Sequence, residues 1–394
     1  MGSDWCNLLP ELLQSIAEKI TSLADYLRFR AVCRPWLSAC SPHPSHLPLQ
    51  LPWLMLPYQS DGNNNSTRLF YDLSDSKIHK LDLPETRGVF ICGSSHGWLV
   101  LQKGQVMSLL NPITHATIPL PPFTAPPSNL GIAPFDASDP EHFFENCEDD
   151  RYAIKPTDHV MVLKAILTSS PLDPSCKVFV FTGSNWQLAF CKIGDKCWTV
   201  IEFESISPWG SDICDFTYID GFVYTVNPFS TVTMYNLNNP SRTLLGGGID
   251  LIGIHLVEGV SGDILLIYDR PIYVNGVLKE TEYTVYKLSN PGEPNWIEVV
   301  DVGQNVLFLG GNYHALSLSS ANLQLPEWGA NCLCYDSVRT EQRNRQDSSA
   351  SWYNHKIKLA RLDDGTTTDI TGDLGSFQVN DHWQKSLWLT PSLL

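Results

Sequence analysis

The chain is poor in charge, and poorest in positive charge. Only 17% of its 394 residues are Asp, Glu, Lys or Arg, and 26 basic residues stand against 42 acidic ones. In soluble domains, charged residues usually make up about a quarter of all residues. A formal net charge of -16 repels a phosphate backbone, so we expect no nucleic-acid partner.

Long apolar runs are missing as well. No stretch of about eighteen apolar residues occurs, so we expect no membrane span. The N-terminus has no basic start followed by an apolar core, so we expect no signal peptide. The sequence therefore favours the cytoplasm, the nucleus or both, where the 11 cysteines stay reduced and act as small apolar residues when buried.

The motifs of common catalytic and metal sites are lacking too. There is no phosphate-binding Gly-x-x-x-x-Gly-Lys, no Gly-x-Ser-x-Gly elbow and no pair of CxxC motifs. Cys332 and Cys334 would share one strand face, which is not a zinc knuckle. We therefore predict no metal, no cofactor and no catalysis. An enzyme stays open as an alternative, with Asp215, Asp220 and Asp263 as candidate carboxylates, although Asp is also a common turn residue.

What the chain does have is an N-terminal segment, residues 1–40, with large apolar residues at helical spacing. Pro10 suits a first helical turn, Ser22 with Asp25 resembles a capping box, and Pro35 interrupts a long helix. These signals predict three short helices. Forty residues rarely bury enough surface to fold alone, so part of this apolar surface must contact another chain or the rest of this one.

Beyond the predicted helices the sequence pattern changes. Residues 41–57 are rich in proline and predict an extended connector. From residue 58 to 394, short β-rich runs alternate with turns, and the runs that begin at Gly221 and Gly262 lie about forty residues apart, the period of a propeller blade. We predict an all-β propeller of six blades, with an exposed acidic loop inserted near 128–158.

The N-terminal segment resembles the F-box, a motif of about forty residues that begins with Leu-Pro and ends with Val-Cys-x-x-Trp. The matching residues are Leu9-Pro10 and Val32-Cys33-Arg34-Pro35-Trp36. This resemblance implies docking on the adaptor subunit of an SCF ubiquitin ligase and, through it, on the cullin scaffold. The expected adaptor-binding residues are Leu9, Pro10, Leu12, Leu13, Ile16, Ile20, Leu23, Val32, Cys33 and Trp36. The alternative is an N-terminal cap packed on the propeller, and Trp36 also suits the core of the segment itself.

The remainder resembles plant F-box proteins with a KIB-type β-propeller, over roughly residues 48 to 336. Matching segments include Cys92–Val100, Leu110–Pro112 and Leu307–Gly310. The resemblance implies a substrate receptor, in which the helices hold the ligase and the propeller holds the protein to be ubiquitylated. Loops on a rigid scaffold commonly bind partners. The candidate substrate contacts are His96, Asn312, Tyr313 and Trp328, although His96 also fits a turn and Trp328 also fits packing against a blade.

Three functions from different classes therefore stand at this point. The first is a non-catalytic substrate-receptor subunit of an SCF-type ubiquitin ligase. The second is a stand-alone β-propeller interaction protein that never joins a ligase. The third is a propeller enzyme that acts on glycosides.

Overall fold

The computed structural model describes most of the chain. The described residues are 5–41, 44, 46–47, 50–57, 66–123, 161–182, 188–201, 213–237, 241–245, 254–274, 277–289, 295–311, 314–323, 329–341, 351–372, 374, 376–379 and 386–393. The predicted loop near 128–158 and the candidate contacts Asn312, Tyr313 and Trp328 lie outside them. Within the described residues, no helix is long and apolar enough to cross a membrane.

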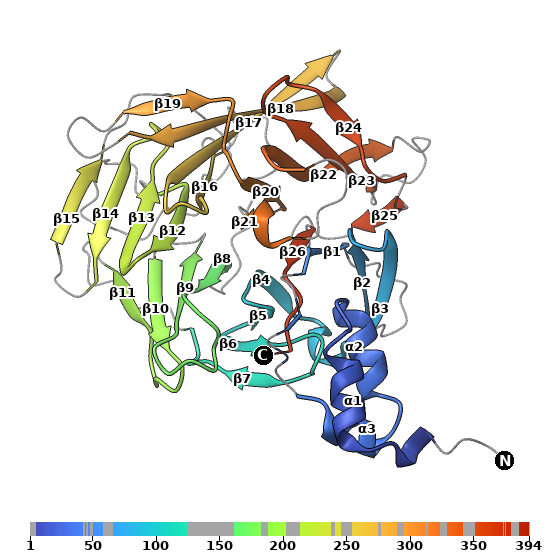
Figure 1. Cartoon of the computed structure of the whole chain (residues 1–394). Helices are drawn as coiled ribbons and strands as arrows, with labels where there is room; N and C mark the ends of the chain where they lie inside the picture. Colours follow the sequence, from blue (N-terminus) through green and yellow to red (C-terminus); the bar gives the residue numbers. More distant parts are fainter. Residues whose placement is uncertain are drawn as a thin grey trace.

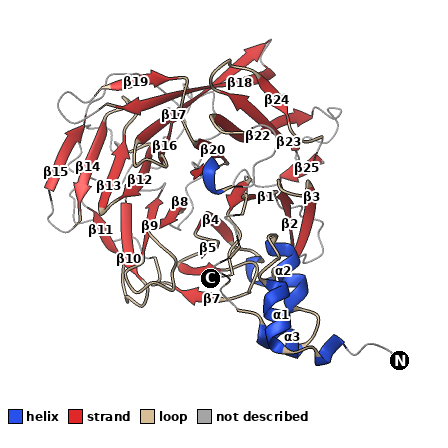
Figure 2. Cartoon of the chain, in the orientation of Figure 1, coloured by secondary structure: helices blue, strands red, loops and turns tan. Residues whose placement is uncertain are grey.

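The α-helices lie at the N-terminus, and strands make up most of the remaining structure (Figure 2). A short 3-10 helix, η1 (Trp5–Asn7), precedes α1 (Pro10–Ala17), α2 (Leu23–Arg30) and α3 (Arg34–Ala39). Pro10 occupies the first turn of α1, and the Ser22 hydroxyl accepts the Asp25 N–H at 3.4 Å as the N-cap of α2. Pro35 lies at the start of α3, where its missing N–H costs no hydrogen bond. The prediction of three short helices is confirmed, and we call residues 5–40 the hook.

The strands form a six-bladed propeller, as predicted (Figure 1). Blade 1 is β26 (Leu387–Leu389), β1 (Trp53–Met55), β2 (Thr67–Asp72) and β3 (Lys77–Asp82). Blade 2 is β4 (Phe90–Ser95), β5 (Trp98–Lys103), β6 (Val106–Leu110) and β7 (Thr117–Pro119). Blade 3 is β8 (Val162–Leu167), β9 (Lys177–Thr182), β10 (Leu188–Lys192) and β11 (Thr199–Ile201). In each, the first-named strand lies nearest the centre of the ring.

The second half of the ring follows the same plan with one departure. Blade 4 is β12 (Asp215–Ile219), β13 (Phe222–Val226), β14 (Val232–Asn236) and β15 (Ser241–Leu245). Blade 5 is β16 (Ile254–Glu258), β17 (Ile264–Val274), β18 (Val277–Leu288) and β19 (Trp296–Val299). Blade 6 is β21 (Ala315–Ser319), β20 (Asn305–Leu309), β22 (Cys332–Glu341), β23 (Ser351–Arg361) and β24 (Thr367–Asp369), with β25 (Ser376–Val379) beside β23. This blade is wider than the others because its sheet has six strands instead of four, and its β20 and β22 run parallel. Two further 3-10 turns are η2 (Pro84–Thr86) and η4 (Ser320–Asn322).

The ring is closed by strands from the two ends of the chain. In blade 1, β26 pairs with β1, so that Leu54 lies opposite Trp388, and β1 pairs on its other side with β2. Sharing a blade between the chain ends protects sheet edges that would otherwise be open. The connector expected over 41–57 is therefore shorter than predicted, because Trp53–Met55 is a fully buried strand of the propeller.

The core consists of apolar clusters between neighbouring blades. Between blades 2 and 3, Trp98, Val100 and Met107 pack against Val178 and Val180. Second strands such as β9 are buried on both faces, which explains their continuous apolar sequence. Three cysteines belong to this same cluster, namely Cys92, Cys176 and Cys191. Burial raises the pKa of the Cys191 thiol to about 12, with smaller contributions from Asp195 and Cys176, so it stays protonated.

Polar groups tie the inner strands together at the centre. The Lys164 ammonium on β8 lies 2.6 Å from the Asp215 carboxylate on β12, and both side chains are buried. Asp215 also accepts the Leu256 N–H of β16 at 2.8 Å. On the other side of the ring, His314 Nε2 lies 3.0 Å from the Ser94 carbonyl of β4. These contacts link blades 3, 4 and 5, and blades 2 and 6.

Candidate functional site

The propeller has two faces, and the hook attaches to one of them. Successive strands of a blade alternate in direction, so the turn from the first to the second strand lies on one face and the turn from the second to the third lies on the other. Gly97 is in a first-to-second turn, and a Cβ added there would overlap the Cβ of Ser392. The Asn111 amide donates to the Ser392 carbonyl at 3.0 Å, and the next residue, Leu393, packs against the core of the hook. We call this the hook face and the opposite one the far face.

The hook exposes a row of large apolar side chains. Leu9, Leu12 and Ile16 lie along one side of the first helix and are 63%, 50% and 45% exposed. Spacings of three and four residues place them on a single helical face. The exposed side chains of Val32 and Leu37, from the turn before α3 and from α3, belong to the same short helical segment. Of the thirteen exposed large apolar side chains in the described residues, six are in the hook, which makes it the candidate interaction surface.

Other residues of the predicted adaptor-binding set face inward. Leu13 and Leu23 are 1% and 3% exposed, so both side chains are covered by the chain itself. Ala17, Tyr26 and Cys40 form the small cluster at its base. In this arrangement Leu13 and Leu23 present almost no surface to a partner.

The remaining predicted residues have mixed environments. Pro10 is exposed, whereas Ile20, Cys33 and Trp36 are half-buried. The Trp36 ring packs on Phe29 with centroids 4.3 Å apart, and its indole N–H donates to the Trp5 carbonyl at 2.9 Å. Trp36 therefore supports the hook from inside while part of its ring remains accessible.

Two exposed residues of the hook were not in the predicted set. Trp5 is 62% exposed and Leu37 is 47% exposed. Trp5 precedes the Leu-Pro start of the motif, and Leu37 follows its closing tryptophan. A search for any large apolar residue next to the motif, rather than inside it, would have found both.

A second set of contacts fixes the hook to the propeller. The Gln50 side chain accepts the Leu23 N–H at 3.2 Å and donates to the Thr21 carbonyl at 3.4 Å. Gln50 thereby satisfies a backbone N–H at the start of α2 that has no partner within the helix. Together with Leu47 and Leu393 at the base of the hook, this joins the helices to chain segments from both ends.

His96 lies in a two-residue turn between β4 and β5. Both central residues have positive φ, 51° at His96 and 81° at Gly97, as type I′ hairpin turns require. The turn is on the hook face, beside the tail residue Ser392. The geometry thus gives His96 a clear structural role, and it places His96 near the hook rather than on the far face.

The far face carries the features that extend furthest from the ring. The strands of the β17–β18 hairpin have 11 and 12 residues, and those of β22 and β23 have 10 and 11, against 3 to 6 in the other blades. Both hairpins end on the far face. The β17–β18 hairpin joins the second strand of blade 5 to the third, and β22 runs parallel to β20, the second strand of blade 6, so it ends on the same face as a second strand. In blade 4, Phe229 in the turn between β13 and β14 is 63% exposed on the same face.

The three carboxylates considered for an enzyme have separate surroundings. Asp215 is fully buried and paired with Lys164. Asp220 lies in a two-residue turn at φ 48°, and Asp263 pairs with Lys287 at 2.9 Å. Burial raises the pKa of Glu258, and the nearby Asp220 carboxylate raises it further. The structure does not bring the three predicted carboxylates together into one site.

Comparisons with known proteins agree with this architecture. The profile of the KIB1-4 beta-propeller family matches residues 70–357. The F-box protein SKIP23 of Arabidopsis thaliana is 24% identical over 339 residues, which covers 78% of each chain. The F-box protein At2g26160 of the same plant is 22% identical over 329 residues, covering 78% of this chain and 88% of the relative. Among solved structures, TolB from Acinetobacter baumannii aligns with 87% of this chain and 66% of its own at 9% identity and a TM-score of 0.43, too low to carry an argument.

Proposed function

Because this chain belongs to the KIB1-4 β-propeller family, we propose that it is the substrate-recognition subunit of an SCF-type ubiquitin ligase. In this role the hook binds the adaptor subunit, and the cullin scaffold joins through the adaptor. The propeller holds the target protein. The chain itself carries out no chemistry.

The exposed apolar row of the hook is the observation that carries this proposal. Leu9, Leu12 and Ile16 leave a continuous apolar strip in water on a segment of only forty residues. Packing such a strip into a groove of a partner removes it from water at about 25 cal/mol per Å². Helices that insert an apolar face into a groove are a common recognition mode. Relatives that carry the F-box name point to the adaptor as that partner.

We place substrate binding on the far face. Adaptor bound to the hook would occupy space beside the hook face, including the turn with His96. The two long hairpins and the exposed ring of Phe229 lie on the opposite side. Aromatic side chains are frequent among the residues that dominate binding energy.

The cysteines support a reducing compartment, the cytoplasm or the nucleus. All ten cysteines in the described part of the chain are free thiols. Burial raises the pKa of Cys214 and Cys332 to about 12, so these thiols stay protonated and unreactive.

The test is adaptor binding by the full-length chain. We expect the wild type to co-purify with a plant SCF adaptor. The double variant Leu12→Asp/Ile16→Asp should abolish the complex, because each substitution places a carboxylate in the apolar contact. The matched control is Leu172→Asp, which changes a leucine of similar exposure, 56%, on the propeller and should bind like the wild type.

The opposite results separate the alternatives. A wild-type chain that ignores the adaptor would favour the stand-alone propeller. The proposed substrate-binding face is tested by proximity labelling in the presence of a proteasome inhibitor. Candidate substrates are the labelled proteins whose turnover depends on the intact hook. We expect these proteins to lose their labelling in the Phe229→Asp variant. Labelling that is unchanged in Phe229→Asp but lost when His96 is replaced would move the substrate to the hook face.

A further inference from the structure

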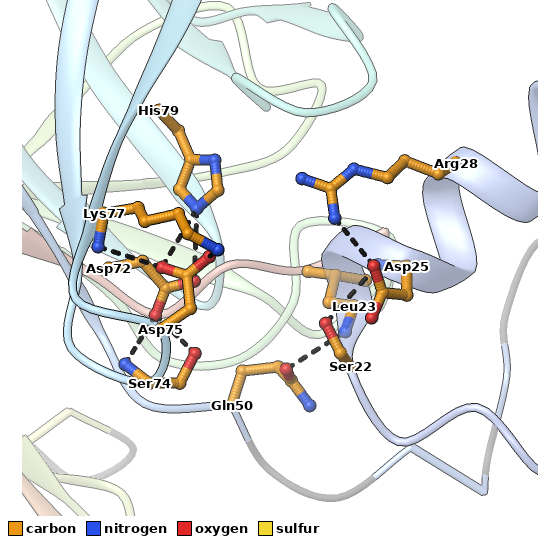
Figure 3. Close-up of polar contacts among 10 residues, drawn as sticks. All are labelled: Ser22, Leu23, Asp25, Arg28, Gln50, Asp72, Ser74, Asp75, Lys77 and His79. Carbon is orange, nitrogen blue, oxygen red and sulfur yellow. Dashed lines mark hydrogen bonds and ion pairs between the residues drawn. The ribbon is translucent and has the colours of Figure 1, made fainter.

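Three potential metal ligands converge at the turn between β2 and β3, on the hook face of blade 1. They are Asp72, Asp75 and His79, whose ligand atoms all lie within 4.8 Å of one another. His79 Nε2 is 3.4 Å from Asp72 Oδ2 and 3.7 Å from Asp75 Oδ1. Figure 3 shows the imidazole pointing toward both carboxylates, with α2 of the hook across from them.

The imidazole nitrogen at the centre of this cluster lacks a hydrogen bond. His79 Nε2 is buried and has no hydrogen-bond partner among the described residues, although two carboxylate oxygens lie close to it. A buried polar atom without a partner costs free energy. The distances from His79 Nε2 to the two carboxylate oxygens are long for direct hydrogen bonds, and they suit a cation bound between the three atoms.

A small cation fits these distances. In a tetrahedral zinc site with bonds of about 2.0 Å, neighbouring ligand atoms lie about 3.3 Å apart. The 3.4 and 3.7 Å separations around His79 Nε2 are close to that edge length. Three protein ligands would leave a fourth position for water.

The surrounding residues hold the ligands in place. The strand register places His79 diagonally across from Asp72 on one face of the hairpin. The His79 ring stacks on Trp53 with centroids 4.9 Å apart and planes at 21°. Asp72 Oδ1 accepts the backbone N–H and the hydroxyl of Ser74, at 2.7 and 2.6 Å, which leaves Oδ2 directed at His79.

One neighbouring cation competes for the cluster. The Lys77 ammonium lies 3.5 Å from Asp75 Oδ2, but its side chain is 71% exposed. Exposed ion pairs contribute little. The other oxygen, Oδ1, accepts the Lys77 backbone N–H at 3.0 Å and lies 3.7 Å from His79 Nε2, and a second lone pair of this oxygen remains for a cation.

We propose that Asp72, Asp75 and His79 bind a divalent cation of the zinc type. The imidazole selects zinc over calcium and magnesium, which prefer oxygen ligands throughout. This inference stands apart from the proposed ligase function, because it concerns a site that neither the adaptor nor the substrate needs to contact.

The experiment uses the full-length chain, stripped with a chelator and then titrated with Zn²⁺. We expect one saturable site by calorimetry, one zinc retained per chain after gel filtration by elemental analysis, and no saturable heat with Ca²⁺ or Mg²⁺. Zinc should also raise the melting temperature, since it binds the folded chain. Absence of a saturable zinc site would overturn the proposal.

Two conservative variants test the ligands. Asp72→Asn keeps an oxygen for Ser74 but removes the charge, and His79→Phe keeps the stack on Trp53 but removes the nitrogen. Each should weaken zinc binding at least tenfold. The matched control is His115→Asn, which removes a histidine 3.3 Å from a single carboxylate, Glu85. Equal affinity in all three variants would contradict the assignment.

The thiols are the main competing ligands, since Cys6 and Cys197 are exposed. Replacing Zn²⁺ with Co²⁺ distinguishes binding at the Asp72, Asp75 and His79 cluster from binding at cysteine. Nitrogen and oxygen ligation gives a weak visible spectrum that disappears in His79→Phe. A strong sulfur-to-cobalt charge-transfer band that persists in His79→Phe would place the metal on cysteine and overturn the proposal.

Discussion

The hook and the propeller differ in how much of their large apolar side chains they leave exposed. In the hook, Leu9, Leu12 and Ile16 are about half exposed, whereas in the propeller the inner residues of neighbouring blades pack to near-complete burial. Among the residues that the structure describes, the hook has one small cluster of buried apolar residues, whereas the blades have six larger ones. Apolar surface that a chain does not bury within itself is available for a partner.

The polar groups show the reverse pattern. The hook's ion pair, Arg28 with Asp25, is exposed on both sides, at 66% and 60%, and contributes little to stability. The propeller buries Lys164 and Asp215 at its centre. The propeller also carries exposed ion pairs, such as Arg270 with Glu282, so the contrast concerns the buried pair at its centre.

The largest expected effect comes from the centre of the propeller. Asp215→Ala leaves the buried Lys164 ammonium without its partner, and removes the acceptor for the Leu256 N–H. Breaking a buried ion pair from one side costs about 3–5 kcal/mol. Urea unfolding followed by tryptophan fluorescence should show the loss.

The control for this variant replaces both partners. Lys164→Met with Asp215→Leu removes the two charges together, so the double variant should be more stable than Asp215→Ala. A double variant that is less stable than the single one would mean that hydrogen bonds, and not the unpaired charge, dominate at this site.

The next effect compares two neighbouring leucines of α1. Leu13 is 1% exposed and Leu12 is 50% exposed. Leu13→Ala should destabilise the hook by about 3 kcal/mol, because it opens a cavity. Leu12→Ala should change stability by less than about 0.5 kcal/mol yet weaken adaptor binding. Amide hydrogen exchange of α1 measures the loss of stability, and the affinity for the adaptor measures the loss of binding. If both variants lost the same hydrogen-exchange protection in α1, the predicted difference between Leu12 and Leu13 would be wrong.

Acid should weaken the propeller through His314. Burial lowers the pKa of His314 from 6.5 to about 4. The unfolded chain therefore takes up a proton at a higher pH than the folded chain, so stability falls as the pH drops from 6.5 to 4, by about 3 kcal/mol. Above pH 6.5 this contribution is constant. Unfolding curves of His314→Gln should lack this part of the pH dependence, and identical slopes for the two proteins would contradict the assignment.

The smallest effect concerns the tail that joins the two regions. Gly97→Ala would strain a positive φ and press on Ser392, whereas Gly104→Ala has a similar φ of 59° and open space around its Cβ. Each should cost about 1 kcal/mol from the backbone. Gly97→Ala should in addition expose the C-terminal tail to limited proteolysis. Equal cleavage in both variants would mean that Ser392 does not depend on this contact.

Local patterns in the sequence predicted most of the fold. Helical spacing with Pro10, Ser22 and Pro35 predicted three helices. Short β-rich runs and one interval of about forty residues predicted a propeller, and the predicted number of six blades is confirmed. The predicted boundary at residue 57 was wrong because Trp53–Met55 pairs with β26 from the far end of the chain. Pairing across more than three hundred residues leaves no local signal in either strand.

The candidate site was predictable in part. The Leu-Pro start and the Val-Cys-x-x-Trp end located the hook, but they could not separate Leu12 from Leu13, because helical spacing does not say which side faces the chain's own core. The cluster of Asp72, Asp75 and His79 was missed entirely. Its members form no standard metal motif in sequence, and the reversal of the hairpin brings them together.

By itself, the sequence determined that this protein has a short helical segment and a long β-rich one, since side-chain periodicity and turn chemistry are local properties. The tertiary structure decided which side of the hook stays exposed, which end strand closes the ring, and which polar groups meet at the centre and at the β2–β3 turn. These depend on contacts between residues far apart in the chain, or on opposite arms of a hairpin. Such contacts exist only after the ring has closed and the hook has packed against the tail.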